Sequence, residues 1–308
     1  MKILIKERND TEKRSWVKAF SSLGIKTAVW NGGTSAFDTF DSFEPTIFIC
    51  NAEHLNIDIV KCLNQRPYLK TLINVRPNST KDIIPTNSNM PVASDLELKL
   101  IDQITCDKFL YTSNRNNSLF DYEDLYTINN SADIFLQYTP SIKSDIVYVG
   151  DYDNNILNMT LLKLCFDFKY NIKIFGNTKW PVCQYCGVCP DVMSVKSGAR
   201  INLNFGKDYE ILHGFDAPTD LYTNYFYKFF TISTQYSDFP TTSFHTISDF
   251  FDMIDRFINH VEHTYDIIDS HYNYALNNTS LHRVSYILQI MGEYNCQQQI
   301  TEYLKKYY

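Results

Sequence analysis

The chain has 308 residues, 44% of them hydrophobic and 15% aromatic, which is enough for two domains with full cores and excludes a globally disordered protein. Its 28 basic and 35 acidic side chains give a formal net charge of −7, which argues against a nucleic-acid binder that relies on a global basic field, but not against a local basic crevice. No apolar run reaches the length of a membrane-spanning helix, about 18 residues, and the first residues lack the apolar centre and cleavage site of a signal peptide. We therefore expect a cytoplasmic protein, in a host cell if its bias toward Asn, Asp, Tyr, Phe, Ile and Lys reflects an AT-rich viral genome.

Strand-like and helix-like segments alternate through the first half of the chain. Residues 2–5 are mostly apolar, as in a buried strand, and residues 11–23 carry apolar side chains at helical spacing until Gly24, a residue typical of a helix C-terminus. Further strands are predicted at residues 25–30, 45–50, 71–75, 107–113 and 132–138, with a helix at 57–65. This succession predicts a parallel, doubly wound sheet with right-handed crossovers.

The pattern restarts after residues 138–144, which have the composition of an interdomain linker. Strands are predicted at residues 145–150, 172–175, 201–205 and 229–234, and amphipathic helices at 249–261 and 281–291. We therefore predict an α/β fold of two doubly wound, Rossmann-like domains with a helical C-terminal tail. The N-terminal domain would span residues 1–140, and the C-terminal domain, terminal helices included, residues 145–308.

Strand ends in the second half carry small and polar residues, at the edge where open parallel sheets bind their ligands. They are Gly150, Asp151, Gly176, Asn177 and Asn204. A glycine there lets the backbone approach a diphosphate, and the following helix N-termini offer free amides to it. Two plainer interpretations stay open: Gly150 as a tight turn after a buried strand, and Asp151 as a solvated loop residue or helix N-cap.

Four short motifs, in this order, resemble the GT-B glycosyltransferases, specifically their CgeB-like, spore-maturation group. They are Tyr148-Val149-Gly150, Phe175-Gly176 followed by Trp180, the segment Ser-Gly-Ala-Arg-Ile-Asn-Leu-Asn at 197–204, and Ser280-Leu281-His282-Arg283. The resemblance extends over most of the chain and is strongest over residues 133–290. It implies a GT-B-like fold and the transfer of a hexosyl or pentosyl group from a nucleotide-diphosphate sugar.

The resemblance also implies that the second domain holds the donor and the first domain the acceptor. The donor would meet Gly150, Gly176, Arg200 and the loop 213–220, in which His213 would stabilise the leaving diphosphate. GT-B folds commonly hold a diphosphate without a metal, so neither a metal nor an obligatory cofactor is expected. The acceptor is predicted to be a glycan, a protein or a modified nucleobase, since viral enzymes that glycosylate bases share this architecture. The acidic net charge places the nucleobase last.

The resemblance breaks at residues 224–230, where the family carries Arg-x-Phe-Glu followed by a glycine. Tyr227 stands where the glutamate that holds donor hydroxyls is expected, and no glycine follows it. Three explanations are open: Asp216 or Asp220 replaces the glutamate, the donor differs, or the domain is catalytically weakened. The last of these leads to the alternative of a catalytically silent GT-B relative that acts as a binding or assembly subunit.

General-base candidates in the first half lie just past strand ends, within reach of an acceptor hydroxyl if the transfer is inverting. They are Asp10, Glu53 and His54. Asn31 would also meet the acceptor, and Arg8 and Arg76 would hold an anionic acceptor or simply face water. Each of the three base candidates, taken alone, fits a cap or loop role better than a catalytic one, and a retaining transfer would need no dedicated base.

The segment Cys183-x-x-Cys186-x-x-Cys189-Pro190 has a spacing found in iron–sulfur and zinc loops. A closed site needs a fourth ligand, and no further cysteine is near in sequence, so His213 could supply it only through the fold. We therefore predict no metal and interpret the loop as a variable connection, with an iron–sulfur or zinc protein as a third hypothesis. The other cysteines are predicted to be small core residues of a reducing compartment: Cys50, Cys62, Cys106, Cys165 and Cys296.

Overall fold

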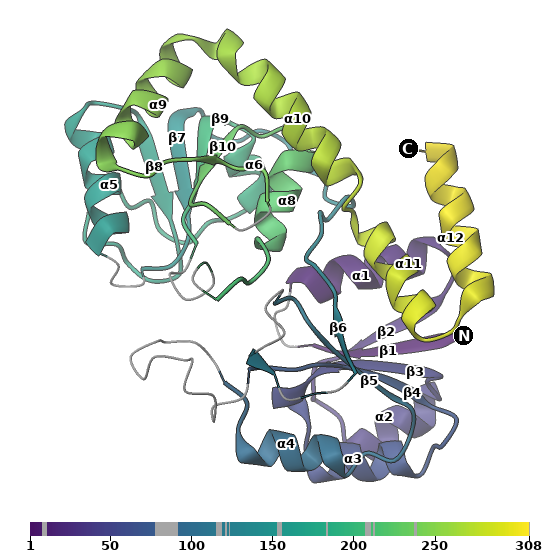
Figure 1. Cartoon of the computed structure of the whole chain (residues 1–308). Helices are drawn as coiled ribbons and strands as arrows, with labels where there is room; N and C mark the ends of the chain where they lie inside the picture. Colours follow the sequence, from purple (N-terminus) through teal and green to yellow (C-terminus); the bar gives the residue numbers. More distant parts are fainter. Residues whose placement is uncertain are drawn as a thin grey trace. The chain divides into compact units, whose positions relative to one another are not determined.

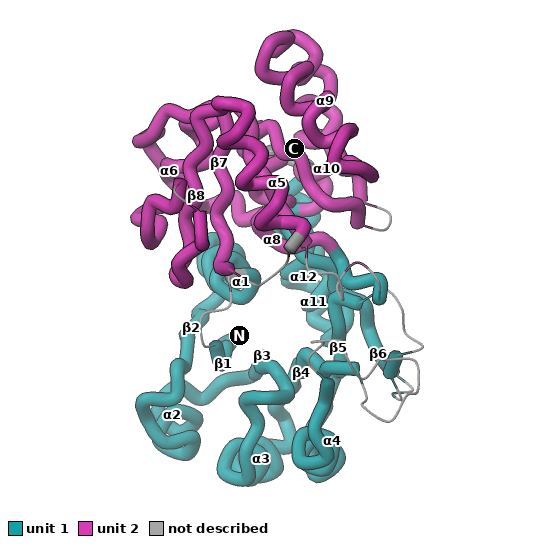
Figure 2. The backbone as a smooth tube through the Cα atoms, turned by 90° about the vertical axis from the view of Figure 1, so that its left-hand side faces the viewer, with its two compact units in different colours: residues 1–131, 212–216, 279–308 teal, residues 132–211, 217–278 magenta. Residues whose placement is uncertain are grey.

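The computed structural model describes residues 1–7, 11–77, 92–114, 119–120, 122, 124–152, 156–182, 184–206, 211, 213–236 and 239–307. The chain forms two compact units, which Figure 2 colours separately. Unit 1 comprises residues 1–131, 212–216 and 279–308, and unit 2 comprises residues 132–211 and 217–278. Within the described residues, no helix combines the length and apolarity needed to cross a lipid bilayer.

Unit 1 is built on a six-stranded sheet in the order β2-β1-β3-β4-β5-β6, in which every neighbouring pair is parallel. Its strands are β1 Lys2–Lys6, β2 Lys26–Trp30, β3 Ile47–Asn51, β4 Lys70–Asn74, β5 Lys108–Thr112 and β6 Leu125–Thr127. Its helices are α1 Thr11–Ser22, α2 Ala36–Phe43, η1 Ala52–His54, α3 Ile57–Asn64, α4 Asp95–Asp102, α11 Ser280–Ile290 and α12 Tyr294–Tyr307. In Figure 1, α2, α3 and α4 cover one face of this sheet, and α1, α11 and α12 lie on the other side.

The core of unit 1 follows from the apolar pattern of its elements. Phe40 of α2, Ile59 of α3 and Leu100 of α4 are buried in one cluster with Phe48 from the middle of β3. Gly24 has a φ of +74° and closes α1, as its position in the sequence predicts, because glycine adopts this left-handed conformation without strain. Helices on both faces of a parallel sheet give the doubly wound architecture that the strand–helix alternation predicts.

Unit 2 repeats this architecture with a five-stranded parallel sheet in the order β11-β10-β9-β7-β8. Its strands are β7 Ser144–Val149, β8 Ile172–Phe175, β9 Ala199–Asn204, β10 Thr231–Ser233 and β11 Thr242–Ser243. Its helices include α5 Ile156–Asp167, α6 Val192–Lys196, α8 Thr219–Phe226, α9 Ile247–Asn259, η3 Val261–Thr264 and α10 Tyr265–Leu276. Leu161 of α5 and Phe250 of α9 pack with Trp180 and with Ile174 and Ile201 of the sheet.

Both sheets reverse their strand order at one point, between β1 and β3 in unit 1 and between β7 and β9 in unit 2. The crossovers leave the sheet in opposite directions there, so the loops after the two strands part and leave room for a ligand at the carboxyl edge. The residues after β1, β3, β7 and β9 are therefore the first places to look for chemistry.

The prediction of a strand at residues 132–138 is wrong. These residues form no strand, and the last strand of the unit 1 sheet, β6, lies earlier in the chain, at Leu125–Thr127. Ala132 donates its N–H to the Asn278 carbonyl oxygen at 2.9 Å, and two later residues of the segment bond to side chains instead of a neighbouring strand. Asp133 donates its N–H to the Thr223 hydroxyl at 3.0 Å, and Leu136 donates its N–H to the Tyr227 hydroxyl at 3.0 Å. Its apolar residues are therefore used to pack an extended connection beside α8.

The terminal helices were predicted to belong to the second domain. The structure assigns them to unit 1 instead. Here α11 packs against α1, and the Arg283 guanidinium donates from Nε to the Asn129 carbonyl oxygen at 2.8 Å. The Lys70 ammonium reaches the turn after α11 and bonds the Met291 carbonyl oxygen and a Glu293 carboxylate oxygen, both at 2.7 Å. Unit 1 therefore needs both ends of the chain to complete its second helical layer.

Candidate functional site

The ends of β7 and β8 in unit 2 meet through two glycines. A Cβ atom at Gly176 would lie within 3.0 Å of the Gly150 carbonyl oxygen, closer than real Cβ atoms come, so these loops touch only because no side chain separates them. Trp180 supports this contact by donating its indole N–H to the Gly150 oxygen at 2.8 Å. Both predicted glycines therefore lie at the carboxyl edge and hold the two strand ends together.

Asp151 organises the loop after β8. It accepts the Asn177 backbone N–H, the Thr178 backbone N–H at 3.3 Å and the Asn177 side-chain amide at 3.3 Å. Burial raises the pKa of this carboxyl, but the hydrogen bonds from Asn177 and Thr178 outweigh that effect and leave the pKa below its usual value. The structure thus brings Asp151 and Asn177 together around an ionised carboxylate.

The end of β9 lies next to β7 at the switch point of unit 2. The Asn204 carbonyl oxygen accepts the Thr234 N–H at 3.1 Å, and the Gly206 N–H donates to the Thr234 hydroxyl at 2.8 Å. Tyr148 and Phe205 stack there with ring centroids 5.2 Å apart. Asn204 therefore shares the carboxyl edge with Gly150, beside an aromatic pair.

The start of α8 faces the same edge, because a helix that connects neighbouring parallel strands runs antiparallel to them. Asp220 lies in its first turn with a side chain that is 55% exposed, and the Lys196 Nζ is 3.7 Å from its Oδ2. The Lys196 side chain is only 5% exposed. The buried Lys196 ammonium therefore holds the accessible Asp220 carboxylate in place. Of this pair, only Asp220 was proposed as a site residue from the sequence.

Tyr227 lies at the opposite end of α8, as its C-cap. Its hydroxyl donates to the Leu136 carbonyl oxygen at 2.9 Å and accepts the Leu136 N–H at 3.0 Å, and its ring packs edge-on against Tyr138. The next residue, Lys228, has a φ of 59°, a conformation that favours glycine. This position corrects the placement of Tyr227 in the donor site, because its hydroxyl is used to attach the 132–138 segment to α8.

Arg200 lies at the wrong edge of the sheet for a donor ligand. The register pairs Tyr148 with Leu203, so Gly150 is level with Phe205, which is five residues, or about 16 Å, beyond Arg200 along the strand. The Arg200 side chain is 59% exposed, and its Nε lies 3.9 Å from the Asp145 carboxylate. The prediction of a phosphate-binding Arg200 is therefore corrected to an ion pair at the amino edge.

The loop expected to complete the donor site is divided between the units. His213 and Asp216 belong to unit 1, and Asp220 belongs to unit 2. Asp216 is buried and accepts the Asn130 N–H at 2.7 Å, while its own N–H donates to the Ser113 carbonyl oxygen at 3.1 Å. His213 is buried as well, and its Nε2 has no hydrogen-bond partner within the described residues. Asp216 therefore anchors the loop after β5 within unit 1.

In unit 1, the loops after β3 and β4 bring Glu53, His54 and Arg76 together, as their places after strand ends predict. Arg76 forms an ion pair with Glu53 and lies 3.7 Å from Glu97. Asn51 donates its side-chain amide to Glu53 at 3.4 Å, and the His54 Nε2 lies 3.7 Å from the same carboxylate. An imidazole beside a carboxylate is a common arrangement for a general base.

Two lysines at the switch point of unit 1 were not predicted. Lys13 of α1 is fully buried, and its Nζ donates to the Asn51 side-chain oxygen. Lys6 ends β1 and lies over the Trp30 ring with Nζ 3.7 Å from the centroid, and partial burial lowers its pKa. Both lie near Cys50, whose burial raises its pKa to about 12. The strand-end rule could have found Lys6, but no sequence signal indicates that Lys13 turns inward.

Three predicted residues lie outside the described part of the chain: Arg8, Asp10 and Cys183. Cys186 is exposed and Cys189 half-buried, and the described residues contain no group of three His, Cys, Asp or Glu residues that could hold a metal ion. The cysteines predicted in the core are buried at Cys50, Cys62, Cys106 and Cys165 and half-buried at Cys296. Asn31 is exposed and accepts the Gly33 N–H at 3.2 Å, which gives it a turn-forming role.

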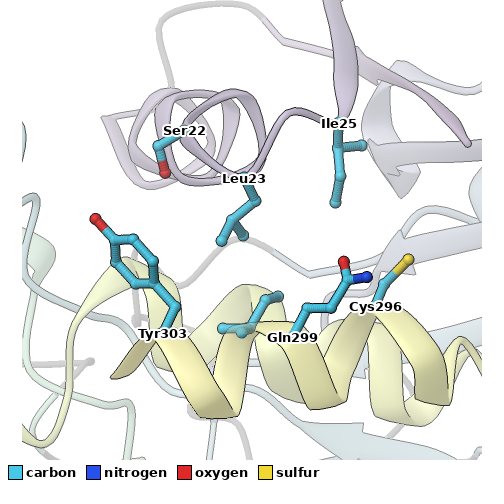
Figure 3. Close-up of a pocket in the computed structure, with 7 residues that line it drawn as sticks. Ser22, Leu23, Ile25, Cys296, Gln299 and Tyr303 are labelled. Carbon is cyan, nitrogen blue, oxygen red and sulfur yellow. The ribbon is translucent and has the colours of Figure 1, made fainter. Parts of the chain in front are cut away.

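A pocket of about 270 Å³ in unit 1 lies away from these edges. Figure 3 shows Leu23 and Ile25 opposite Cys296, Gln299 and Tyr303 of α12. Ile25 precedes β2, so the pocket borders the amino edge of the sheet. We therefore interpret it as a packing seam beneath the terminal helix and do not include it in the candidate site.

No family model and no curated protein matches the chain, so its resemblance to the CgeB-like group stays a prediction. Among solved structures, UDP-GlcNAc 2-epimerase from Neisseria meningitidis bound to UDP-GlcNAc aligns with 94% of this chain and 100% of its own, at 9% identity and a TM-score of 0.53. T4 phage BGT in complex with its UDP-glucose substrate aligns with 100% of this chain and 98% of its own, at 15% identity and a TM-score of 0.49. CalG4, the calicheamicin glycosyltransferase, aligns with 95% and 98% at 6% identity and a TM-score of 0.43. The epimerase comparison shows that the chain has a GT-B-like fold of two Rossmann-like domains.

Proposed function

We propose that the chain is a glycosyltransferase that moves a sugar from a nucleotide-diphosphate donor bound by unit 2 to an acceptor bound by unit 1. The observation that carries this proposal is the carboxyl edge of the unit 2 sheet, where the glycine-ended strands β7 and β8, the Asp151 loop and the start of α8 meet near the switch point. The fold shared with an epimerase bound to UDP-GlcNAc supports it.

The donor would be held by backbone and by one carboxylate. Free N–H groups at the start of α8 and backbone near Gly150 and Gly176 would face the diphosphate. Asp220 would accept hydrogen bonds from two donor hydroxyls, the task of the family's motif glutamate, while Lys196 holds that carboxylate in place. No metal enters this scheme, so we expect full activity in excess EDTA, and loss of activity there would contradict it.

The acceptor would be activated in unit 1 by the His54–Glu53 pair. One of these groups takes the proton of the acceptor hydroxyl, whose oxygen forms a bond to the anomeric carbon of the sugar. The bond from that carbon to the diphosphate breaks, and its electron pair leaves on the phosphate oxygen. An inverting transfer to a glycan or protein hydroxyl follows from this scheme, with a modified nucleobase as a further acceptor.

The test is thermal unfolding of the protein against UDP, GDP, ADP, CDP and TDP and their sugars. A ligand at about 100 times its Kd stabilises the folded state by about 2.7 kcal/mol, enough to raise the melting temperature by several degrees. We expect one nucleotide to give a selective rise that Asp220→Asn abolishes. The matched control is Asp252→Asn, at an exposed position of α9, which should leave the rise unchanged. No rise with any nucleotide would refute the donor site.

The alternative is a catalytically silent relative that acts as a binding or assembly subunit. It is favoured by the position of Tyr227, whose hydroxyl is bonded to Leu136, so the motif glutamate is replaced there by a structural residue. A nucleotide sugar that stabilises the protein, without hydrolysis or transfer to glycan, protein or nucleobase acceptors, would support this alternative.

A further inference from the structure

A hollow on the β11 side of unit 2 has no part in the proposed reaction. It measures about 480 Å³ and is lined by Thr241, Thr242, Ser243, Asp266, Ile267, Ser270 and His271. The lining comes from the β11 strand with its preceding residue and from the first half of α10. Strands β10 and β9 separate β11 from β7, which places the hollow roughly 14 Å across the sheet from the strand that ends at Gly150.

His271 forms the buried wall of this hollow. It is 6% exposed, and its ring stacks on Tyr225 with centroids 3.9 Å apart and planes 14° apart. Neither ring nitrogen has a hydrogen-bond partner within the described residues, and the ring lines the hollow. Burial lowers the pKa of His271 to about 4, so at neutral pH one nitrogen donates and the other accepts. Because the ring lines the hollow, these nitrogens are available to a ligand that enters it.

Three other lining residues, from β11 and its preceding residue and from α10, present acceptors to the hollow. The Thr241 hydroxyl donates to the Gln235 side-chain oxygen at 3.1 Å, and the Ser243 hydroxyl donates to the same oxygen at 2.5 Å. Each hydroxyl has a single proton, so its oxygen can only accept toward the hollow. The Asp266 carboxylate likewise accepts and is the one charged group among the described lining residues. A ligand must therefore offer donors to these three oxygen groups, while the Thr242 and Ser270 hydroxyls of the lining can either donate or accept.

The charge and the hydrogen-bond pattern together select the ligand. No Lys or Arg is among the described lining residues, and Asp266 would repel a phosphate or a carboxylate. An ammonium ion would suit Asp266 but could not accept the proton that the neutral His271 donates. A hydroxyl group both donates and accepts, and a sugar ring presents several of them in a volume that this hollow admits. We propose that the hollow binds an uncharged saccharide, at a site separate from the donor edge of unit 2.

The proposal is tested on the full chain by NMR, following the His271 ring signals during titration with glucose, galactose, mannose and N-acetylglucosamine up to about 100 mM. We expect saturable shifts with at least one of these sugars and at least tenfold weaker binding of glucose 6-phosphate, because Asp266 repels the phosphate. His271→Phe keeps a ring against Tyr225 but removes both nitrogens, and should weaken binding at least tenfold by saturation-transfer measurements. His260→Phe, at an exposed position outside the hollow, is the matched control and should bind as the parent does.

Ser270 is exposed, so Ser270→Arg fills the hollow without disturbing the core and covers the case in which His271→Phe fails to fold. We expect this variant to lose sugar binding and to keep its thermal response to nucleotides. The proposal is overturned if none of the four sugars shifts the His271 signals, or if Ser270→Arg binds sugar as tightly as the parent chain. Neither result depends on the donor edge, so this failure is distinguishable from failure of the proposed glycosyl transfer.

Discussion

Mild acid should destabilise unit 2 through His271. Above pH 6.5 this imidazole is neutral in both the folded and the unfolded states and has no effect on their balance. Below pH 6.5 the unfolded state takes up a proton, while the folded state resists protonation until its pKa of about 4. The free energy of unfolding should therefore fall by about 1.4 kcal/mol by pH 5.5 and by about 2.6 kcal/mol by pH 4.5.

The assay is urea unfolding at pH 7.5, 5.5 and 4.5, for His271→Phe and for the parent chain, both carrying Trp16→Phe and Trp30→Phe, so that the fluorescence followed is that of Trp180 in unit 2. Phenylalanine can stack on Tyr225 and cannot take up a proton, so the variant removes the titration while it keeps the packing. The expected result is that the parent loses stability relative to the variant by the amounts above. Asp151 and Asp191 affect the comparison between pH 7.5 and 4.5 little. Their pKa values are lowered in the folded state, so their contribution to the free energy of unfolding is lost mainly below pH 4.

Parallel pH dependences of the parent and the variant would refute the reasoning. Such a result would mean that His271 is protonated in the folded state, with its charge compensated by a group such as Asp266, which lines the same hollow. Direct NMR titration of the ring would then give a pKa near or above 6.5, its ordinary value.

Two further predictions concern residues at the strand and helix ends of unit 2. Tyr227→Phe leaves the backbone N–H and carbonyl of Leu136 without this partner and should cost about 1–3 kcal/mol in urea unfolding. The same variant should keep its thermal response to nucleotide sugars, and loss of that response would return Tyr227 to the donor site. Gly176→Ala forces the ends of β7 and β8 apart and should cost about 1–3 kcal/mol, whereas Gly33→Ala, whose Cβ would meet only an Asn31 side-chain oxygen at 3.4 Å, should be nearly neutral. Equal stability of these two alanine variants would show that the glycine contact is dispensable.

The architecture was predictable because parallel strands buried on both faces read as short apolar runs between turn residues. The segment 132–138 has the same composition, yet its backbone groups bond to Thr223 and Tyr227, some 90 residues away. Local pattern contains no information about such partners. The same limit explains the terminal helices: their amphipathic faces were readable, but the bonds from Lys70 to the turn before α12 arise only in the folded chain.

Strand direction decides which predicted site residues come together. Gly150, Asp151, Gly176, Asn177 and Asn204 end strands or follow them, and the structure gathers them at one edge. Arg200 begins its strand, so counting residues from its start would have placed it at the other edge. The buried partner Lys196 and the unpaired His271 had no comparable signal, because an inward-facing cation or imidazole on a helix looks in sequence like a solvated one.

The nucleotide and sugar measurements separate the functions that the fold leaves open. A nucleotide response with sugar binding near His271 describes a transferase in which one unit holds a donor at its carboxyl edge and a saccharide at its β11 side, which favours a glycan over a protein or nucleobase acceptor. Sugar binding without any nucleotide response would instead support the catalytically silent alternative, as a lectin-like protein. This outcome is possible because the hollow lies on the β11 side of the sheet and contains none of the donor-edge residues. A nucleotide response without sugar binding keeps the transferase and leaves His271 with a structural role against Tyr225. Asp220→Asn should abolish only the nucleotide response, and Ser270→Arg should abolish only sugar binding. The two variants therefore test the donor site and the hollow of unit 2 independently of each other.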